Sequence, residues 1–270
     1  MTTIYEISMK NFNEIQFYNP TIFNDLKTIN DFIRYGASCF NKANLVYGHG
    51  TINAIEDSIA LILYSLNLPY TVLNEVIDCQ LTQFEKQDIL NLFKLRIESK
   101  MPVAYITHTS HYANLEFYID QRALIPRSPI FEIIENHFQP WVSIDKVNKI
   151  LDLCTGSGCL AIVTAYHFEH AEIFASDDSE EALAVANINV KKHNLEDRIH
   201  LLKSDLFAQL PKTQFDVILA NPPYVDANDL ENLPDEYRHE PKMALEAGED
   251  GLFYVKQILN EAKNFLSDKG

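Results

Sequence analysis

Two glycines and several polar residues follow directly after a short apolar run in the middle of the chain. The run Ile150–Leu153 leads into Cys154-Thr155-Gly156-Ser157-Gly158. Glycine allows a tight turn with positive φ and lets a ligand lie against bare main chain. The chain has only 8 glycines in 270 residues, so a pair in one turn is notable. The pattern predicts a cofactor loop, although Gly156-x-Gly158-x-x-Ala161 also fits nicotinamide dinucleotides.

Two acidic residues refine the kind of cofactor. Asp177 ends the second apolar run, 21 residues after Gly156, where its carboxylate could accept both hydroxyls of a ribose. That position suits a nicotinamide dinucleotide and S-adenosylmethionine equally. Asp152 lies four residues before the first glycine, where it would repel a pyrophosphate and attract an ammonium, directly or through water. We therefore favour a cofactor that carries an ammonium and a sulfonium.

The segment Asn221-Pro222-Pro223-Tyr224 follows another apolar run, FDVILA at 215–220. Two prolines fix their own φ angles and offer carbonyl groups without N–H donors, which makes a stiff wall rich in acceptors. The Asn221 side-chain oxygen and the Pro222 carbonyl could hold the NH₂ of an amide or an exocyclic amine, with the Tyr224 ring packed on the planar group. A plain proline turn is the alternative, which the preceding strand and glycine loop disfavour.

Asp205 and Leu206 follow the third apolar run. Asp205 could hydrogen-bond to an adenine amine with Leu206 against its ring, or it could cap a helix that faces solvent. We assign no chemistry to the Cys154 and Cys159 thiols, because both flank the loop at packed positions without an adjacent base. The four cysteines have neither disulfide nor metal spacing, which suits a reducing cytoplasm.

Short apolar runs alternate with helical stretches after Trp141. The strands are predicted at 149–153, 171–176, 198–204 and 215–220, with helices at Cys159–Phe168 and Ser179–His193 between them. Continuous β-branched runs separated by helices indicate βαβ units and a parallel sheet covered on both faces. We expect a doubly wound, Rossmann-like α/β domain that binds its ligand at the carboxyl ends of the strands.

The first hundred residues have apolar side chains at helical spacing. A helix is predicted from Ile52 to Leu66 behind a Thr51 cap, and another behind the capping box of Thr82 and Glu85. The pattern between Thr21 and Phe40 is helical but weaker. From Pro102 on, VAYIT at 103–107 and LEFYI at 115–119 predict a β-hairpin, in which His108 and His111 are polar hairpin residues and no metal site is expected.

The composition constrains the partners. Lys and Arg total 22 against 38 Asp and Glu, a formal charge of −16, which disfavours non-specific DNA binding and favours a basic protein partner. Hydrophobic residues at 47 % and charged residues at 22 % are typical of globular chains, and the length suits two domains. No apolar run approaches the ~20 residues of a membrane span and no signal peptide is evident, so we expect a cytoplasmic protein without membrane partners. The oligomeric state is not predicted.

The motifs resemble those of a known family. A DLxTGSG loop together with NPPY is similar to class I S-adenosylmethionine-dependent methyltransferases that modify protein glutamine side chains, and the similarity covers essentially the whole chain. YGHGT at 47–51, LIPRSPI at 124–130 and YRHEP at 237–241 resemble the type that acts on the third large-subunit ribosomal protein (PrmB type). The resemblance implies that S-adenosylmethionine is bound by Asp177, by Leu206 at the adenine, and by Thr155, Gly156, Ser157, Gly158 and Cys159.

The same resemblance implies roles near the methyl acceptor. Asn221 would touch both the methyl donor and the substrate, while Pro222, Pro223 and Tyr224 shape the glutamine pocket. Arg127 and Glu132 would fix the hinge segment to the catalytic domain. The implied division is a helical substrate-recognition domain at 1–101, a hairpin hinge at 102–127 and a methyltransferase domain at 128–270.

One departure from the family pattern concerns the end of the sheet. Family members continue into a fifth strand and a closing hairpin, whereas this sequence ends at Ser267-Asp268-Lys269-Gly270. We expect four strands in the order 3-2-1-4 with 215–220 at the edge, in a truncated chain or one whose edge a partner covers. The leading hypothesis is methylation of a glutamine amide in a basic ribosomal protein. The alternatives are an adenine-amine nucleic-acid methyltransferase and a non-catalytic cofactor-binding module of ribosome assembly.

Overall fold

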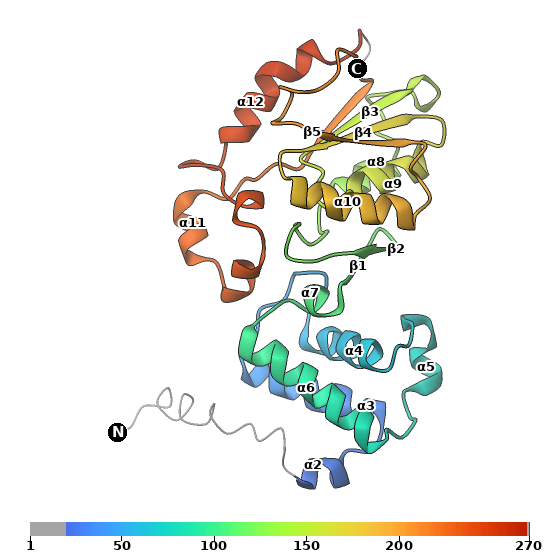
Figure 1. Ribbon diagram of the computed structural model, residues 1–270, viewed down its shortest axis with the longest axis vertical. Coiled ribbons are helices and arrows are strands. Elements are labelled where there is room, and N and C mark those ends of the chain that lie inside the picture. The colour runs from blue at the N-terminus through green and yellow to red at the C-terminus, as the bar shows by residue number, and fades with distance from the viewer. Residues whose placement is uncertain (1–19, 269) are drawn as a thin grey trace. The chain divides into compact units, whose positions relative to one another are not determined.

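The computed structural model describes residues 20–268 and Gly270, and divides the chain into two compact units (Figure 1). The first unit ends at Thr107 and the second begins at His108. The hinge predicted at 102–127 is therefore shared between them: Val103–Thr107 belongs to the helical unit, and residues 108–127 belong to the second unit.

The described part of the first unit contains helices and, outside them, one isolated antiparallel bridge between Thr28 and Gln80. Thr82 and Glu85 form the predicted capping box, and Thr28 with Asp31 forms another. The predicted Thr51 cap is wrong, because the Asn53 side chain accepts the amide hydrogen bonds at the start of the helix. The helices are α2 (Pro20–Asp25), α3 (Ile29–Lys42), α4 (Ala54–Ser65), η2 (Tyr70–Val72), α5 (Leu73–Val76), α6 (Gln83–Ser99) and α7 (Val103–Thr107).

A buried ion pair holds the YGHGT segment against this helical core. Arg96 Nε donates to Asp57 Oδ2 at 2.9 Å, and both side chains are almost fully buried. Arg96 also donates to the Val46 carbonyl, and Thr51 Oγ1 donates to Asp57. Thr51 therefore ties the segment to the ion pair instead of capping the helix.

Among the described residues, one bent pair of helices passes a test of length and composition for a membrane span. No single helix among residues 20–268 is long and apolar enough to cross a membrane. Ala54–Ser65 and Tyr70–Val76 together reach the length and composition, with an angle of 104° between them.

The predicted hairpin is present, but its first arm lies later in the chain. Strands β1 (Thr109–Tyr112) and β2 (Leu115–Tyr118) are antiparallel, with Ala113 and Asn114 at positive φ in the turn. VAYIT, predicted as a strand, is helix α7, and all five of its side chains are buried. Pro102 explains the difference, because a proline is well tolerated in the first turn of a helix and its carbonyl accepts from Tyr105 and Ile106.

The second unit is built on a four-stranded parallel sheet in the order β5-β4-β3-β6. This is the predicted order, third-second-first-fourth. The strands are β3 (Lys149–Leu153), β4 (Glu172–Asp177), β5 (Ile199–Lys203) and β6 (Val217–Ala220). The helices are α8 (Ile130–Glu135), η3 (Ile144–Lys146), α9 (Cys159–His167), α10 (Glu180–Lys192), α11 (Ala227–Asn232), η4 (Asp235–His239), η5 (Lys242–Ala244), α12 (Phe253–Glu261) and η6 (Ala262–Asn264).

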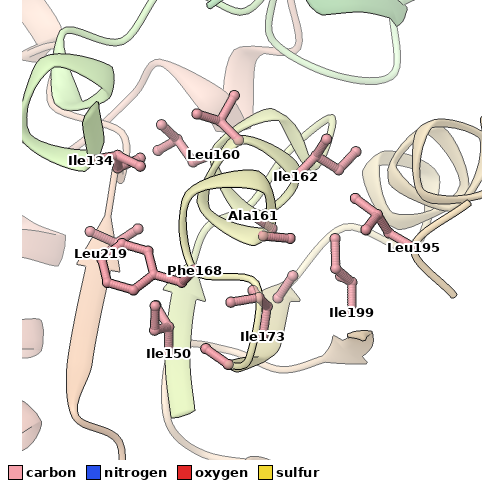
Figure 2. Close-up of a cluster of buried hydrophobic side chains, with 14 of the residues drawn as sticks. Ile134, Ile150, Leu160, Ala161, Ile162, Phe168, Ile173, Leu195, Ile199 and Leu219 are labelled. Atoms are coloured by element: carbon pink, nitrogen blue, oxygen red, sulfur yellow. The ribbon is translucent and has the colours of Figure 1, made fainter. Parts of the chain in front are cut away.

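Both faces of the sheet are covered, as the unbroken apolar strands predict. Helices α8, α9 and α10 lie on one face and α12 on the other (Figure 1). Along β3, Ile150 points into the first core while Leu151 and Leu153 point into the second. Figure 2 shows the first core, where Ile150, Ile173 and Leu219 of the sheet meet Ala161 and Phe168. This two-sided packing fixes the strand ends that hold the site.

The segment just before β6 has a backbone partner near the end of the chain. Phe215 forms an isolated parallel bridge with Leu266, in which its N–H donates to the Phe265 carbonyl at 2.7 Å. The Ser267 N–H donates back to the Phe215 carbonyl at 2.9 Å. Within the described residues, β6 itself pairs only with β3, so it is the edge strand that the sequence predicts.

Candidate active site

The loop after β3 takes the left-handed conformations that its glycines allow. Cys154, Gly156 and Gly158 have φ of 57°, 55° and 80°. A Cβ built on Gly158 would lie 3.2 Å from the Ala186 Cβ, so this glycine permits close packing of the loop on α10. A Cβ on Gly156 would meet nothing within 4 Å, so the loop borders open space at that point. One glycine serves packing, and the other leaves room for a ligand.

Asp152 lies beneath this loop. Its side chain is fully buried, and Oδ2 accepts from Thr155 Oγ1 at 2.6 Å. Burial raises the pKa of this carboxyl to about 7, and the hydrogen bond from Thr155 opposes the rise. Asp152 does not line the pocket described below, so the structure places it as a support of the loop.

Asp177 links the ends of β3 and β4. Its carboxylate accepts from the Gly156 N–H at 2.8 Å and from the Ser179 N–H at 2.9 Å. Burial raises the pKa of Asp177 above its ordinary value, although these two amide hydrogen bonds oppose the rise. A cationic or hydroxyl-bearing ligand would favour the ionised carboxylate at this position.

The turn after β5 carries Asp205 and Leu206. Asp205 is exposed, and its N–H donates to Gln209 Oε1 at 2.7 Å. Leu206 is buried at φ 45°, and both residues line the pocket. The segment continues as turns, so the alternative role of Asp205 as a helix cap is wrong.

Asn221 stands at the carboxyl end of β6, next to the loop that ends β3. The two strands are direct neighbours in the sheet, with Ala220 paired to Leu153. Asn221 and the buried Pro223 line the pocket, whereas Pro222 and the exposed Tyr224 do not. Among the described residues, the Asn221 side-chain amide has no hydrogen-bond partner, so its oxygen is available to a ligand.

One pocket of the second unit brings these segments together. The sequence-predicted residues that line it are Thr155, Gly156, Ser157, Cys159, Asp177, Asp205, Leu206, Asn221 and Pro223. Four sequence-predicted residues do not line the pocket: Asp152, Gly158, Pro222 and Tyr224. Burial raises the pKa of the Cys159 thiol to about 12 and that of the Cys154 thiol further, which favours the protonated form of both.

Two walls of the pocket come from segments that were not predicted to line it. Residues 122–128 line one side, and Pro241, Met243 and Ala244 line another. The LIPRSPI and YRHEP motifs lie in or beside these walls. These motifs were therefore the sequence feature that could have predicted the two walls. Arg127 reaches Glu240 in YRHEP, whereas the exposed Glu132 carboxylate bonds to no described residue, so its predicted fixing role is wrong.

Asn189 is a further positioning residue that the sequence did not reveal. It is fully buried on α10, where its amide pairs with both backbone groups of Tyr118 in β2. Its Nδ2 also donates to the Ser157 carbonyl at 2.9 Å. The hairpin, α10 and the glycine loop are thus joined through one side chain.

The donor set of the pocket fits an adenosine-bearing cation. Ser157 Oγ is buried and has no hydrogen-bond partner among the described residues, so this hydroxyl is available to a ligand. Asp177 offers acceptors for a diol, and Leu206 offers an apolar surface for a base. No group of three or more His, Cys, Asp or Glu within the described part of the chain could hold a metal ion.

The family model described as "Methyltransferase small domain" matches residues 136–248. The ribosomal protein uL3 glutamine methyltransferase of Neisseria meningitidis serogroup A is 47 % identical over 247 residues, which cover 91 % of this chain and 81 % of that protein. The protein of the same name from Francisella tularensis is 44 % identical over 250 residues, which cover 92 % and 80 %.

Solved structures are more distant. The hMettl16 catalytic domain in complex with MAT2A 3'UTR hairpin 1 is 18 % identical, with a TM-score of 0.45 over 71 % of this chain and 66 % of that one. A SAM-dependent methyltransferase from Agrobacterium tumefaciens is 19 % identical, with a TM-score of 0.42 over 60 % and 49 %.

Proposed function

Because the chain belongs to the family of ribosomal protein uL3 glutamine methyltransferases, we propose that it methylates a glutamine side-chain amide of a large-subunit ribosomal protein. S-adenosylmethionine supplies the methyl group when bound. The observation that carries the proposal is the placement of Asn221 beside the glycine loop. Both lie at the carboxyl ends of neighbouring strands and line the same pocket.

The cofactor half of the pocket is assigned to the ends of β3, β4 and β5. Asp177 is already held by two backbone amides, which orient its carboxylate for a ribose diol. Ser157 offers a free buried hydroxyl, and Leu206 offers an apolar contact for adenine. We assign Asp152 an indirect role: it holds Thr155 and therefore the shape of the loop.

The half of the pocket around Asn221 must activate or position a poor nucleophile, the amide nitrogen of the substrate. An amide nitrogen is a weak nucleophile because its lone pair is delocalised into the carbonyl. We infer that Asn221 Oδ1 and the Pro222 carbonyl accept hydrogen bonds from the two N–H groups of the substrate amide. These hydrogen bonds would hold the amide nitrogen in line with the methyl group. Positioning of this kind lowers a barrier by several kcal/mol. The amide nitrogen would gain the methyl group as the S–CH₃ bond breaks and S-adenosylhomocysteine leaves, and one N–H proton would then pass to water, so no general base is needed before transfer. The exposed Tyr224 ring is available to cover the amide plane.

The substrate is assigned by charge as well as by family. A formal charge of −16 favours encounter with a basic protein and disfavours nucleic acid. We assign recognition of that protein to the helical unit and the hairpin. A ribosomal protein is met before assembly in the bacterial cytoplasm, which is therefore the proposed compartment.

Radiolabel transfer tests the proposal directly. The full chain is incubated with labelled S-adenosylmethionine and, separately, with purified ribosomal protein uL3, ribosomal RNA or DNA. Label on the protein alone, at a rate that falls with added salt, is the expected result. Label on RNA or DNA would favour an adenine-amine methyltransferase, and cofactor binding without transfer would favour a non-catalytic module.

A further inference from the structure

Two segments of the second unit that are distant in sequence are joined by an ion pair whose carboxylate is fully buried and whose guanidinium is 24 % exposed. Arg127 Nη1 and Nη2 donate to Glu240 Oε1 and Oε2, each at 2.6 Å. The Glu240 side chain is fully buried, and its Oε1 also accepts from the Ile125 N–H at 3.4 Å. The Arg127 guanidinium lies 5.5 Å from the centre of the Tyr237 ring. The pair thus ties the LIPRSPI segment to the YRHEP segment.

The chain that follows Glu240 leads from this pair to the acceptor segment. Pro241, Met243 and Ala244 come next and line the pocket. The Val225 N–H then donates to the Leu245 carbonyl at 2.8 Å. The Ala247 N–H donates to the Val225 carbonyl at 2.9 Å, which completes a parallel bridge beside Tyr224. Residues 240–247 therefore form a short strut, held by Arg127 at one end and bonded to Val225 at the other.

We propose that the Arg127–Glu240 ion pair is a positioning pair for the methyl acceptor. It holds the Pro241–Ala244 wall in place and, through Val225, sets where Asn221 and Pro222 present their acceptors to the substrate amide. This inference rests on the proposed function, and it assigns to the pair a part in acceptor alignment and none in cofactor affinity.

The geometry of the pair favours alignment over simple stabilisation. An ion pair with a buried carboxylate is weak evidence for stability, because desolvation of the buried charge offsets the attraction. The planar guanidinium binds a carboxylate through two parallel hydrogen bonds, which fix direction as well as distance. Lysine keeps the charge but not the fork, so Arg127→Lys separates orientation from charge.

The test compares three variants of the full chain. Arg127→Lys removes the fork. Arg127→Met with Glu240→Gln removes both charges and leaves no buried charge unpaired. Arg198→Lys is the matched control. Arg198 lies just before β5, outside the pocket lining, and donates to the Ala165, Phe168 and Ala171 carbonyls at the end of α9 and before β4.

The readouts are methyl transfer to the ribosomal protein, cofactor affinity by calorimetry and thermal unfolding. We expect kcat/KM for the ribosomal protein to fall at least tenfold in Arg127→Lys and in the double variant, with cofactor Kd within threefold of the parent. The double variant should regain thermal stability without regaining transfer. Arg198→Lys should lose stability and keep its kcat and KM.

Three results would overturn the inference. They are parental transfer in Arg127→Lys, recovery of transfer together with stability in the double variant, and a loss of cofactor affinity that matches the loss of transfer. The last would place Arg127 in the cofactor site.

Amide hydrogen exchange separates this inference from the proposed function. The Val225 and Ala247 amides should exchange faster in Arg127→Lys than in the parent, while the Thr155 amide, bonded to the Ser176 carbonyl, should not change. If the parent does not methylate the ribosomal protein, the proposed function fails. The exchange rates still test whether the ion pair holds the strut in place, because unchanged rates at Val225 and Ala247 would contradict that inference.

Discussion

Replacement of Asp152 by asparagine should stabilise the protein above pH 7 and leave its stability unchanged near pH 4. The carboxyl is fully buried, and burial raises its pKa to about 7, against an ordinary value of roughly 3.9. Between these values the folded protein holds a proton that the unfolded chain releases, so stability falls as pH rises. Asparagine cannot ionise, and its oxygen can still accept from Thr155 Oγ1.

The size of the effect follows from the distance between the two pKa values. One pKa unit corresponds to about 1.4 kcal/mol, which sets a limit of roughly 4 kcal/mol on the gain above pH 7. Urea unfolding of the parent and the variant at pH 4, 5, 6, 7 and 8 measures this difference in the free energy of unfolding. The two proteins are compared where their m-values agree. A gain that does not depend on pH, or a loss of stability at pH 8, would refute the argument from burial.

Asp216→Asn is a control with the opposite sign. Burial favours the neutral form of Asp216, but amide hydrogen bonds from Asn148 and Lys149 outweigh it and hold the pKa below its ordinary value. The contribution of Asp216 is present above about pH 4 and lost as pH falls through its folded pKa. The asparagine variant should therefore be less stable than the parent at pH 7 and approach it in acid.

Three further substitutions test the supports of the site. Asp177→Ala should weaken S-adenosylmethionine binding by roughly 1.5–3 kcal/mol because a charge-assisted acceptor is lost, and calorimetry that shows unchanged affinity would dismiss the ribose role. Gly251→Ala should cost about 1–3 kcal/mol of stability in urea and slow transfer more than it weakens cofactor binding, since its Cβ would lie 2.6 Å from the Tyr224 carbonyl oxygen at φ 68°. Asn189→Ala should cost about 3 kcal/mol, because it leaves the buried Ser157 carbonyl and the Tyr118 backbone without partners; a loss under about 0.5 kcal/mol would contradict this.

The parallel sheet could be predicted because its signals are local and redundant. Each strand is a short apolar run, and each intervening helix has its own helical pattern in the sequence. The right-handed crossover rule then leaves few possible strand orders. The same redundancy placed the glycine loop, Asp177 and Asn221 at one edge of the sheet. These residues lie at or directly after the carboxyl ends of strands, so the strand order places them without help from distant side-chain contacts.

The errors in the helical unit and hairpin arose where two local signals compete. VAYIT has the composition of a strand, but Pro102 can start a helix, and burial of all five side chains removes the alternation that a half-exposed strand needs. Thr51 and Asn53 are both good cap residues. The structure selects Asn53 because Thr51 is engaged by the buried Asp57, a contact that no local pattern reveals.

The remaining walls of the pocket could not be predicted because they depend on contacts between distant segments. Arg127 and Glu240 are 113 residues apart, and their pairing has no signature in spacing or periodicity. Asn189 resembles an ordinary polar residue on a helix, yet it is buried and joins three elements. Side chains of this kind become visible only when the fold brings their partners together.

The most direct measurement is the methylation of purified ribosomal protein uL3 by the parent chain and by Asn221→Ala and Asn221→Asp, with the modified atom located by mass spectrometry. The account predicts one methyl group on a glutamine side-chain nitrogen and a kcat that falls about a hundredfold or more in Asn221→Ala, with a smaller change in cofactor affinity. Asn221→Asp should bind S-adenosylmethionine at least as well as the parent and still turn over slowly, because its added charge favours the ground-state sulfonium. Near-parental kcat in either variant, or a methyl group on any other atom, would contradict the central claim that Asn221 positions the glutamine amide.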